Sequence, residues 1–203
     1  METQPPLARP PLAIGVMGSA SGPLDIEVVA RVRRLGATIA NTRCTLVTGA
    51  CRGYSYAAVE GAKGAGGLVV GISPALSETE HVHRFGAPVD GFDLLVYTGS
   101  GLMGREVINI RSSDIVVIVG GRSGTLGEFA IAYDEGRLIG VLAASGGVAD
   151  MIEELIERMN KETGARVIYD DDPQRLVSRL VECYRTEHFR RPSTLHDIPS
   201  TAD

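Results

Sequence analysis

DIVVIVGGRSGTLGEF, residues 114–129, contains the clearest indication of the fold in this sequence. Its unbroken β-branched run to Val119 is typical of a strand buried on both faces of a parallel sheet. Glycines then interrupt the run over residues 120–124, and helical spacing follows over residues 125–135. A strand, a tight glycine turn and a helix N-terminus form an anion site, because the first helical N–H groups have no partners within the helix. The stretch therefore predicts a phosphate bound in the turn.

The same alternation of strand and helix runs through the chain. Strands are predicted at residues 12–17, 45–48, 68–72, 92–97, 114–119, 138–142 and 166–169. Helices are predicted at residues 25–42, 55–64, 102–111, 125–135, 148–161 and 173–184. This order indicates an α/β fold: a single-domain, Rossmann-like, doubly wound parallel sheet with helices on both faces. Ligands of such sheets bind at the carboxyl ends of the strands, where the glycine loops fall.

Three segments divide the chain. Residues 1–10 are Pro-rich and predicted to be a disordered leader, residues 11–186 form the Rossmann-like nucleotide-binding domain, and residues 187–203 are predicted to be a disordered polar tail. Within the domain, residues 75–90 have neither helical nor strand periodicity. Their acidic residues and histidines, including His81 and His83, predict a mobile charged lid rather than a metal site, because no third His or Cys accompanies them.

Composition excludes several classes of function. The chain has 203 residues, of which 44% are hydrophobic and 22% charged, as in ordinary globular proteins. Its net charge of −5 and the lack of a basic stripe argue against nucleic-acid binding. No apolar stretch is long enough to span a bilayer. The three cysteines have no metal or redox spacing, so we expect a cytoplasmic protein with reduced thiols.

The glycine loops indicate a small phosphate-bearing ligand. The first loop, with Gly18 and Ser19, lacks the spacing of a dinucleotide-binding fingerprint, and the loop at 120–124 lacks a P-loop lysine. What remains is a cradle for one phosphate or a mononucleotide, with no metal and no cofactor. Glycines that merely form tight turns are the simpler explanation, but they explain three loops at one sheet edge, including the loop at Gly49, less well.

Two charged residues near these loops each have two explanations. Thr125 and Glu128 match a capping box, in which both have structural roles, although a carboxylate beside a phosphate site could instead act on a substrate. From composition alone the cap is favoured. Arg105 is expected near the start of its helix, where a cation is mildly unfavourable, which favours a local role for it over simple solvation.

The spacing of these residues resembles that of the LOG family. Arg105 precedes Asp114 by nine residues, and the strand is followed by Gly-Gly-x-x-Gly-Thr-x-x-Glu. The resemblance extends from about residue 12 to residue 142 and includes the loops at 18–22 and 47–49. Members of this family are cytokinin riboside 5′-monophosphate phosphoribohydrolases, formerly labelled lysine decarboxylases. That older label does not fit, because neither lysine lies at a predicted strand end where pyridoxal phosphate would be held.

The resemblance implies a set of site residues and a function. It makes Arg105 and Glu128 the catalytic pair, and it places the phosphate or nucleotide against the three glycine loops. The residues of these loops are Gly18, Ser19, Gly49, Gly120, Gly121, Arg122, Ser123, Gly124 and Thr125. The implied reaction is hydrolysis of the N-glycosidic bond of a nucleoside 5′-monophosphate, and the implied assembly is a homodimer or a higher homo-oligomer.

Four positions depart from the family pattern P-G-G-x-G-T-x-x-E and its upstream Arg-Lys pair. Gly120 replaces the proline, Arg122 the second glycine, Gly127 the acidic residue before Glu128, and Glu106 the lysine. In these features the chain resembles a sister branch of Rossmann-like nucleotide-binding proteins that is itself similar to molybdenum-cofactor carrier proteins. The alternative function is therefore a carrier that binds a nucleotide or pterin ligand without turning it over.

Overall fold

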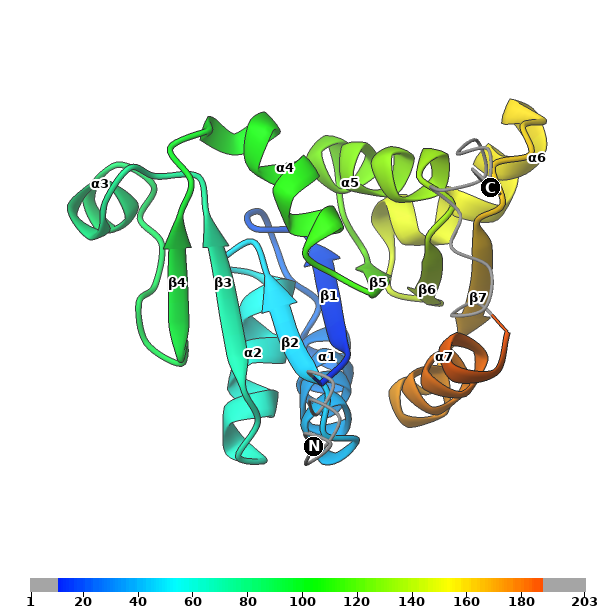
Figure 1. Cartoon of the computed structure of the whole chain (residues 1–203), viewed down its shortest axis with the longest axis horizontal. Helices are drawn as coiled ribbons and strands as arrows, with labels where there is room; N and C mark the ends of the chain where they lie inside the picture. Colours follow the sequence, from blue (N-terminus) through cyan, green and yellow to red (C-terminus); the bar gives the residue numbers. More distant parts are fainter. Residues whose placement is uncertain (1–10, 188–203) are drawn as a thin grey trace, which may run out of the picture.

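Seven parallel strands form one sheet in the computed structural model of this chain, which describes residues 11–187 (Figure 1). The strands are β1 (Ala13–Gly18), β2 (Thr45–Thr48), β3 (Val69–Ser73), β4 (Leu94–Tyr97), β5 (Ile115–Val119), β6 (Leu138–Leu142) and β7 (Arg166–Asp170). The predicted leader and residues 188–203 of the predicted tail lie outside the described residues.

The sheet order is β4-β3-β2-β1-β5-β6-β7. The chain builds outward from β1 to β4, returns to place β5 on the other side of β1, and builds outward again to β7. β1 therefore pairs with both β2 and β5. This reversal between β1 and β5 is the topological switch point at which ligands of open α/β sheets bind. The predicted doubly wound sheet is confirmed.

Helices cover both faces of the sheet (Figure 1). They are α1 (Ile26–Asn41), α2 (Tyr54–Gly64), α3 (Glu78–His83), α4 (Gly101–Arg111), α5 (Ser123–Asp134), a 3-10 helix η1 (Gly147–Met151), α6 (Ile152–Met159) and α7 (Pro173–Thr186). α1, α2 and α7 share one face, and α4 and α5 share the other. Within residues 11–187, none of these helices is long and apolar enough to cross a membrane.

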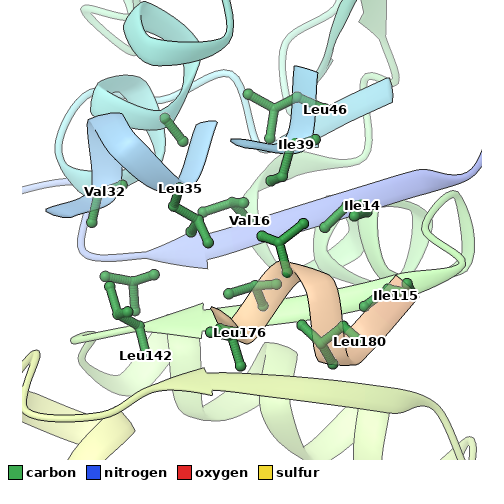
Figure 2. Close-up of a cluster of buried hydrophobic side chains, with 14 of the residues drawn as sticks. Ile14, Val16, Val32, Leu35, Ile39, Leu46, Ile115, Leu142, Leu176 and Leu180 are labelled. Carbon is green, nitrogen blue, oxygen red and sulfur yellow. The ribbon is translucent and has the colours of Figure 1, made fainter. Parts of the chain in front are cut away.

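Each face has its own hydrophobic core. On the α1 side, Leu35 of α1, Ile14 of β1 and Leu180 of α7 are fully buried in one cluster, part of which Figure 2 shows. On the other side, Phe129 of α5 packs with Ile118 of β5 in a second cluster. Because β1 and β5 lie between the two cores, their apolar residues are buried on both faces. That accounts for the unbroken apolar run of β5.

The expectation that residues 75–90 form an irregular loop is wrong, because this segment contains α3. The Ser77 side chain caps the helix by accepting a hydrogen bond from the N–H of Glu80. His81 is fully buried, with Nδ1 2.8 Å from the Ser73 hydroxyl and Nε2 2.9 Å from the carbonyl of Pro88. The histidine fixes α3 to the end of β3 through tertiary hydrogen bonds, which hydrophobic periodicity does not reveal.

The helix after β5 begins earlier than predicted. α5 starts at Ser123 with Arg122 in the N-cap position, and no side chain caps it. Thr125 is therefore inside the first turn, and its buried side chain packs against Gly121. The capping-box explanation favoured from composition is wrong, because Glu128 lies in the second helical turn and bonds to residues of α4 instead.

Close contact between α1 and α2 depends on two glycines. A Cβ on Gly36 of α1 would lie 1.9 Å from the carbonyl oxygen of Ala58, and one on Gly61 of α2 would lie 1.9 Å from that of Arg33. Both obstacles are backbone atoms, which cannot move aside without moving a helix. The two glycines thus set the distance between the helices.

Replacing Gly36 with alanine should therefore destabilise the protein. Alanine favours a helix by about 1 kcal/mol over glycine, but the clash should outweigh this and leave a net loss of about 1–3 kcal/mol, as overpacked cores show. Urea denaturation followed by circular dichroism measures the change. The control is Gly64→Ala, since a Cβ there meets nothing within 4 Å. Equal stabilities for the two variants would contradict the close packing.

Candidate functional site

A cavity of about 370 Å³ opens at the carboxyl ends of β1 and β2, beside the N-terminal halves of α4 and α5. It lies at the sheet edge predicted to bind ligands. Nine of the eleven predicted site residues line it: Gly18, Ser19, Gly49, Arg105, Arg122, Ser123, Gly124, Thr125 and Glu128. The other two, Gly120 and Gly121, line an adjoining cavity. The fold thus gathers into one place residues that are up to 110 positions apart in the sequence.

Arg105 and Glu128 form a buried ion pair in this cavity. Nη1 of Arg105 lies 3.3 Å from Oε1 of Glu128, and each side chain is only 9% exposed. Gly49 makes room for the guanidinium, since a Cβ at that position would lie 2.0 Å from Nη1. Nη2 of Arg105 also lies 3.8 Å from the sulfur of Cys51. An alanine in place of Gly49 would therefore displace the arginine from its carboxylate.

The surroundings of Glu128 raise the pKa of its carboxyl group from 4.5 to about 7. Burial is the main cause, because it disfavours the charged form. The positive charge of Arg105 opposes the shift, the negative charge of Glu106 adds to it, and a hydrogen bond from Asn109 opposes it. A group with a pKa near 7 exists in both protonation states at neutral pH, as a general acid or base requires.

Motif reasoning missed two residues at this site: Asn109, which is buried behind Glu128, and Glu106, which lines the cavity. Asn109 is fully buried, and its Nδ2 lies 3.4 Å from Oε1 of Glu128 and 3.0 Å from the sulfur of Met17. Its Oδ1 has no hydrogen-bond partner within the described part of the chain. The position of Asn109, four residues after Arg105 on α4, is the only sequence signal that could have indicated it, because residues at this spacing share a helix face.

Glu106 is the second missed residue, although it was noted as a departure from the family pattern. It is 6% exposed and lines the cavity. Its carboxylate lies against the start of α5, where a Cβ on Gly127 would be 2.9 Å from one oxygen. Burial raises the pKa of Glu106, and the nearby Arg105 opposes that shift. The absence of a side chain at position 127 leaves the space that the carboxylate of Glu106 occupies.

The N-terminus of α5 faces the cavity with open hydrogen-bond donors. The first backbone N–H in this helix with a backbone acceptor belongs to Leu126, which bonds to the carbonyl of Arg122. The N–H groups of Ser123, Gly124 and Thr125 come before it in the first turn, where no intrahelical acceptor exists. With no side-chain cap on this helix, these donors are available to an anion.

Arg122 reaches over this turn toward the first glycine loop. Its Nη2 donates a hydrogen bond to the hydroxyl of Ser21. The guanidinium is therefore held at the rim, where it adds a positive charge beside the open end of α5. Across residues 11–187, no group of three or more His, Cys, Asp or Glu side chains is placed to hold a metal ion.

Comparisons with known proteins agree with this architecture. The model of the SLOG cluster4 family matches residues 11–177. An uncharacterized protein of Archaeoglobus fulgidus is 36% identical over 131 residues, which cover 64% of this chain and 80% of the relative.

Solved structures give a similar picture. The molybdenum cofactor binding protein of Rippkaea orientalis has a TM-score of 0.71 and 28% identity, covering 87% of this chain and 98% of the other. The molybdenum cofactor carrier protein of Chlamydomonas reinhardtii has a TM-score of 0.70 and 26% identity, covering 87% of this chain and 99% of the other. The similarity therefore covers nearly the full length of both solved chains.

Gly49→Ala should raise the pKa of Glu128 above its wild-type value of about 7. The added methyl group displaces the Arg105 guanidinium, which stabilises the ionised carboxylate. Carbon-detected NMR titration of glutamate carboxyl groups measures this pKa directly. Gly64→Ala, the same exchange far from the cavity, should leave it unchanged. An unshifted pKa in Gly49→Ala would mean that the ion pair does not control the titration of Glu128.

The same pKa predicts how stability depends on pH. Glu128 holds its proton to higher pH in the folded chain than in the unfolded chain. The stability of the wild type relative to Glu128→Gln should therefore fall as the pH rises from about 4.5 to about 7, and level off above. Urea denaturation at a series of pH values tests this trend. A relative stability that rises over this interval would contradict the raised pKa.

Proposed function

We propose that this chain, which belongs to the SLOG cluster4 family, binds a small phosphate-bearing molecule in the cavity beside α4 and α5 and hydrolyses an N-glycosidic bond in it. Family membership confirms the resemblance to the LOG family and its sister branch that the motif predicted. The observation that carries the proposal of hydrolysis is the buried Glu128 carboxyl group, which lines the cavity, pairs with Arg105 and titrates near neutral pH.

The phosphate binds at the N-terminus of α5 in this proposal. The unpaired N–H groups of Ser123, Gly124 and Thr125 donate to its oxygens, as in other phosphate sites at helix N-termini. The Thr125 hydroxyl belongs to the same helical turn and also donates to the phosphate. The Arg122 guanidinium adds a positive charge from the rim. The ligand is a nucleoside 5′-monophosphate or a molecule of similar shape, because this cradle has no P-loop lysine for a triphosphate.

Glu128 and Arg105 then perform the chemistry. The bond between C1′ and the base nitrogen breaks, and a water oxygen forms a new bond to C1′. The two protons of that water end on the leaving base and on the new sugar hydroxyl. Positive charge accumulates at C1′ in the transition state, and the Glu128 carboxylate stabilises it and accepts a proton from the water. Arg105 holds the carboxylate and positions the nucleotide.

A carrier without catalysis is the second candidate, and a specific observation favours it. The solved proteins named for binding or carrying the molybdenum cofactor are 26% and 28% identical to this chain, and almost their whole length is matched. A carrier would use the same phosphate cradle for a pterin ligand. Glu128 would then hold the ligand by a hydrogen bond without promoting bond cleavage, and Asn109 would position the Glu128 carboxyl group.

We also propose that the chain forms a homodimer through α4. Leu102 and Met103 on this helix are 52% and 73% exposed. The edge strand β4 also exposes Leu94 and Val96. Exposed apolar side chains and an unpaired strand edge are features of protein interfaces. A second copy would cover them in a symmetric arrangement.

The cysteines suit a reducing compartment, and we propose the cytoplasm as the location. Cys44, Cys51 and Cys183 are free thiols. Cys51 lines the cavity, and burial raises its thiol pKa while Arg105 opposes the shift. A thiol so close to the ion pair would disturb the site if it were oxidised, which favours reducing surroundings.

Glu128→Gln separates the two functions. Incubation of the wild type with a panel of nucleoside monophosphates, followed by chromatography of free base, should show hydrolysis. The glutamine variant should still bind the nucleotide by calorimetry but release base at least about a hundredfold more slowly, because it lacks the carboxylate charge. Below a pH of about 7 the wild-type rate should fall as Glu128 becomes protonated.

The control is Glu182→Gln, the same exchange at an exposed position on α7, which should leave the rate unchanged. Release of base by Glu128→Gln at the wild-type rate would show that Glu128 is not catalytic. Binding of monophosphates by the wild type without any base release would exclude the hydrolase and support the carrier.

Met103→Glu should dissociate the dimer, because it places a charge in the apolar surface on α4. Light scattering of the wild type should give about twice the mass of one chain, and that of the variant the mass of one chain. Met159→Glu, a similar exchange on α6, should remain dimeric. A monomeric wild type at concentrations well above those of the assay would exclude this assembly.

A further inference from the structure

A second cavity, of about 580 Å³, adjoins the first. The two share Ser19, Ser21 and Arg122, so Arg122 lies along the boundary between them. The first cavity extends toward α4 and α5, and the second extends toward the start of α1 and the loop after β6. Together they follow the carboxyl edge of the sheet from one face to the other.

This arrangement follows from the topology. β1 and β5 are neighbours, and the chain leaves β1 for α1 on one face but leaves β5 for α5 on the other. The loops after the two strands therefore diverge and open a crevice between them. In open α/β sheets this crevice holds ligands that reach across the switch point, dinucleotides among them.

The far wall of the second cavity is a rigid loop. Ser145 accepts a hydrogen bond from the N–H of Gly120 at 2.8 Å and donates one to the carbonyl of Leu142 at 2.6 Å. Asp150 accepts bonds from the N–H groups of Ser145 and Gly146. Ala144 has a φ of +51°, which is unfavourable for a residue with a side chain. The hydrogen bonds of the loop hold Ala144 in this conformation.

The remaining walls present polar groups with unused capacity. Tyr54 is 6% exposed and lines this cavity. Its hydroxyl oxygen accepts a hydrogen bond from the N–H of Asp25 at 3.1 Å, and within the described residues no acceptor receives its own proton. One oxygen of Asp25 caps α1, which leaves the other available. A buried hydroxyl donor and a carboxylate acceptor are groups that bind sugar hydroxyls.

We propose that the two cavities form one binding cleft for a ligand of two parts joined by a diphosphate, the class of nucleoside diphosphate sugars and dinucleotides. The inference rests on the proposed phosphate position at α5. One half of the ligand lies beside Glu128, the diphosphate lies between the N-terminus of α5 and the Arg122 guanidinium, and the sugar of the other half meets Tyr54 and Asp25.

The sequence is compatible with this placement. The loop after β1 lacks the glycine spacing that binds a diphosphate against the first helix of dinucleotide-binding proteins. In this chain the open N–H groups belong to α5 instead, because Asp25 already caps α1. The diphosphate therefore binds on the other side of the switch point, and Arg122 supplies the charge that pairs with its second phosphate.

Calorimetry with two matched ligand series tests the proposal on the whole chain. The series are AMP, ADP and ADP-ribose, and GMP, GDP and GDP-mannose, so that the base is constant within each. In at least one series the diphosphate sugar should bind about tenfold or more tighter than the monophosphate, because only it fills both cavities. Tyr54→Phe and Asp25→Asn should each lower this affinity ratio about threefold or more.

Both variants are designed to fold. Phenylalanine keeps the packing of Tyr54, and asparagine is as good an N-cap as aspartate. The control is Glu27→Gln, which removes a charge from the same helix end but lines neither cavity, so the ratio should not change.

Three results would overturn the proposal. If monophosphates bind and the diphosphate sugars bind no tighter in either series, the second cavity is not part of the site, although the proposed function stands. If the ratio is high but insensitive to Tyr54→Phe and Asp25→Asn, the added affinity arises elsewhere. If no monophosphate or diphosphate sugar binds, the proposed phosphate cradle itself is wrong.

Discussion

The ion pair of Arg105 with Glu128 is the interaction on which the site depends. Both charges lie almost out of solvent, where an unpaired charge would be strongly unfavourable. The partners come from different helices, and the arginine has room only because residue 49 on a third element is glycine. α4, α5 and the end of β2 must therefore be correctly placed together for either charge to be buried. The positive charge of Arg105 offsets only part of the effect of burial on Glu128, so the pKa of Glu128 stays raised at about 7.

The topology turns this local pair into a site. β5 lies beside β1, so the loop that begins α5 faces the loop that begins α1, with the free N–H groups of α5 between them. The helix dipole and the Arg122 guanidinium give this end of the cleft a positive potential. On the adjacent floor lie the carboxyl groups of Glu106 and Glu128, whose negative charge is partly offset by Arg105. A ligand with a phosphate at one end and an electron-poor or hydrogen-donating group at the other matches this polarity.

Hydrolase and carrier need the same phosphate cradle and differ in what happens at Glu128. A carboxyl group with a pKa near 7 can act as a base on a bound water, but when protonated it can also donate a hydrogen bond to a ligand. Asn109 stabilises the ionised form, because its Nδ2 donates to Oε1 of Glu128. Affinity and turnover must therefore be measured separately.

The parallel doubly wound sheet could be predicted from the sequence, because few other folds accommodate unbroken β-branched strands that alternate with helices of this length. The sequence also indicated the carboxyl edge as the site, and the motif resemblance singled out Arg105 and Glu128 together. Local patterns could not reveal that α3 forms, because His81 is held by partners at Ser73 and Pro88. For the same reason, composition favoured a capping role for Glu128 that the structure excludes. Three features emerge only when the elements pack together: Glu128 faces Arg105, Asn109 and Glu106 join them, and a second cavity opens beside Arg122. Those relations depend on which loops meet across the sheet, and hydrophobic periodicity describes each element only with respect to its own axis.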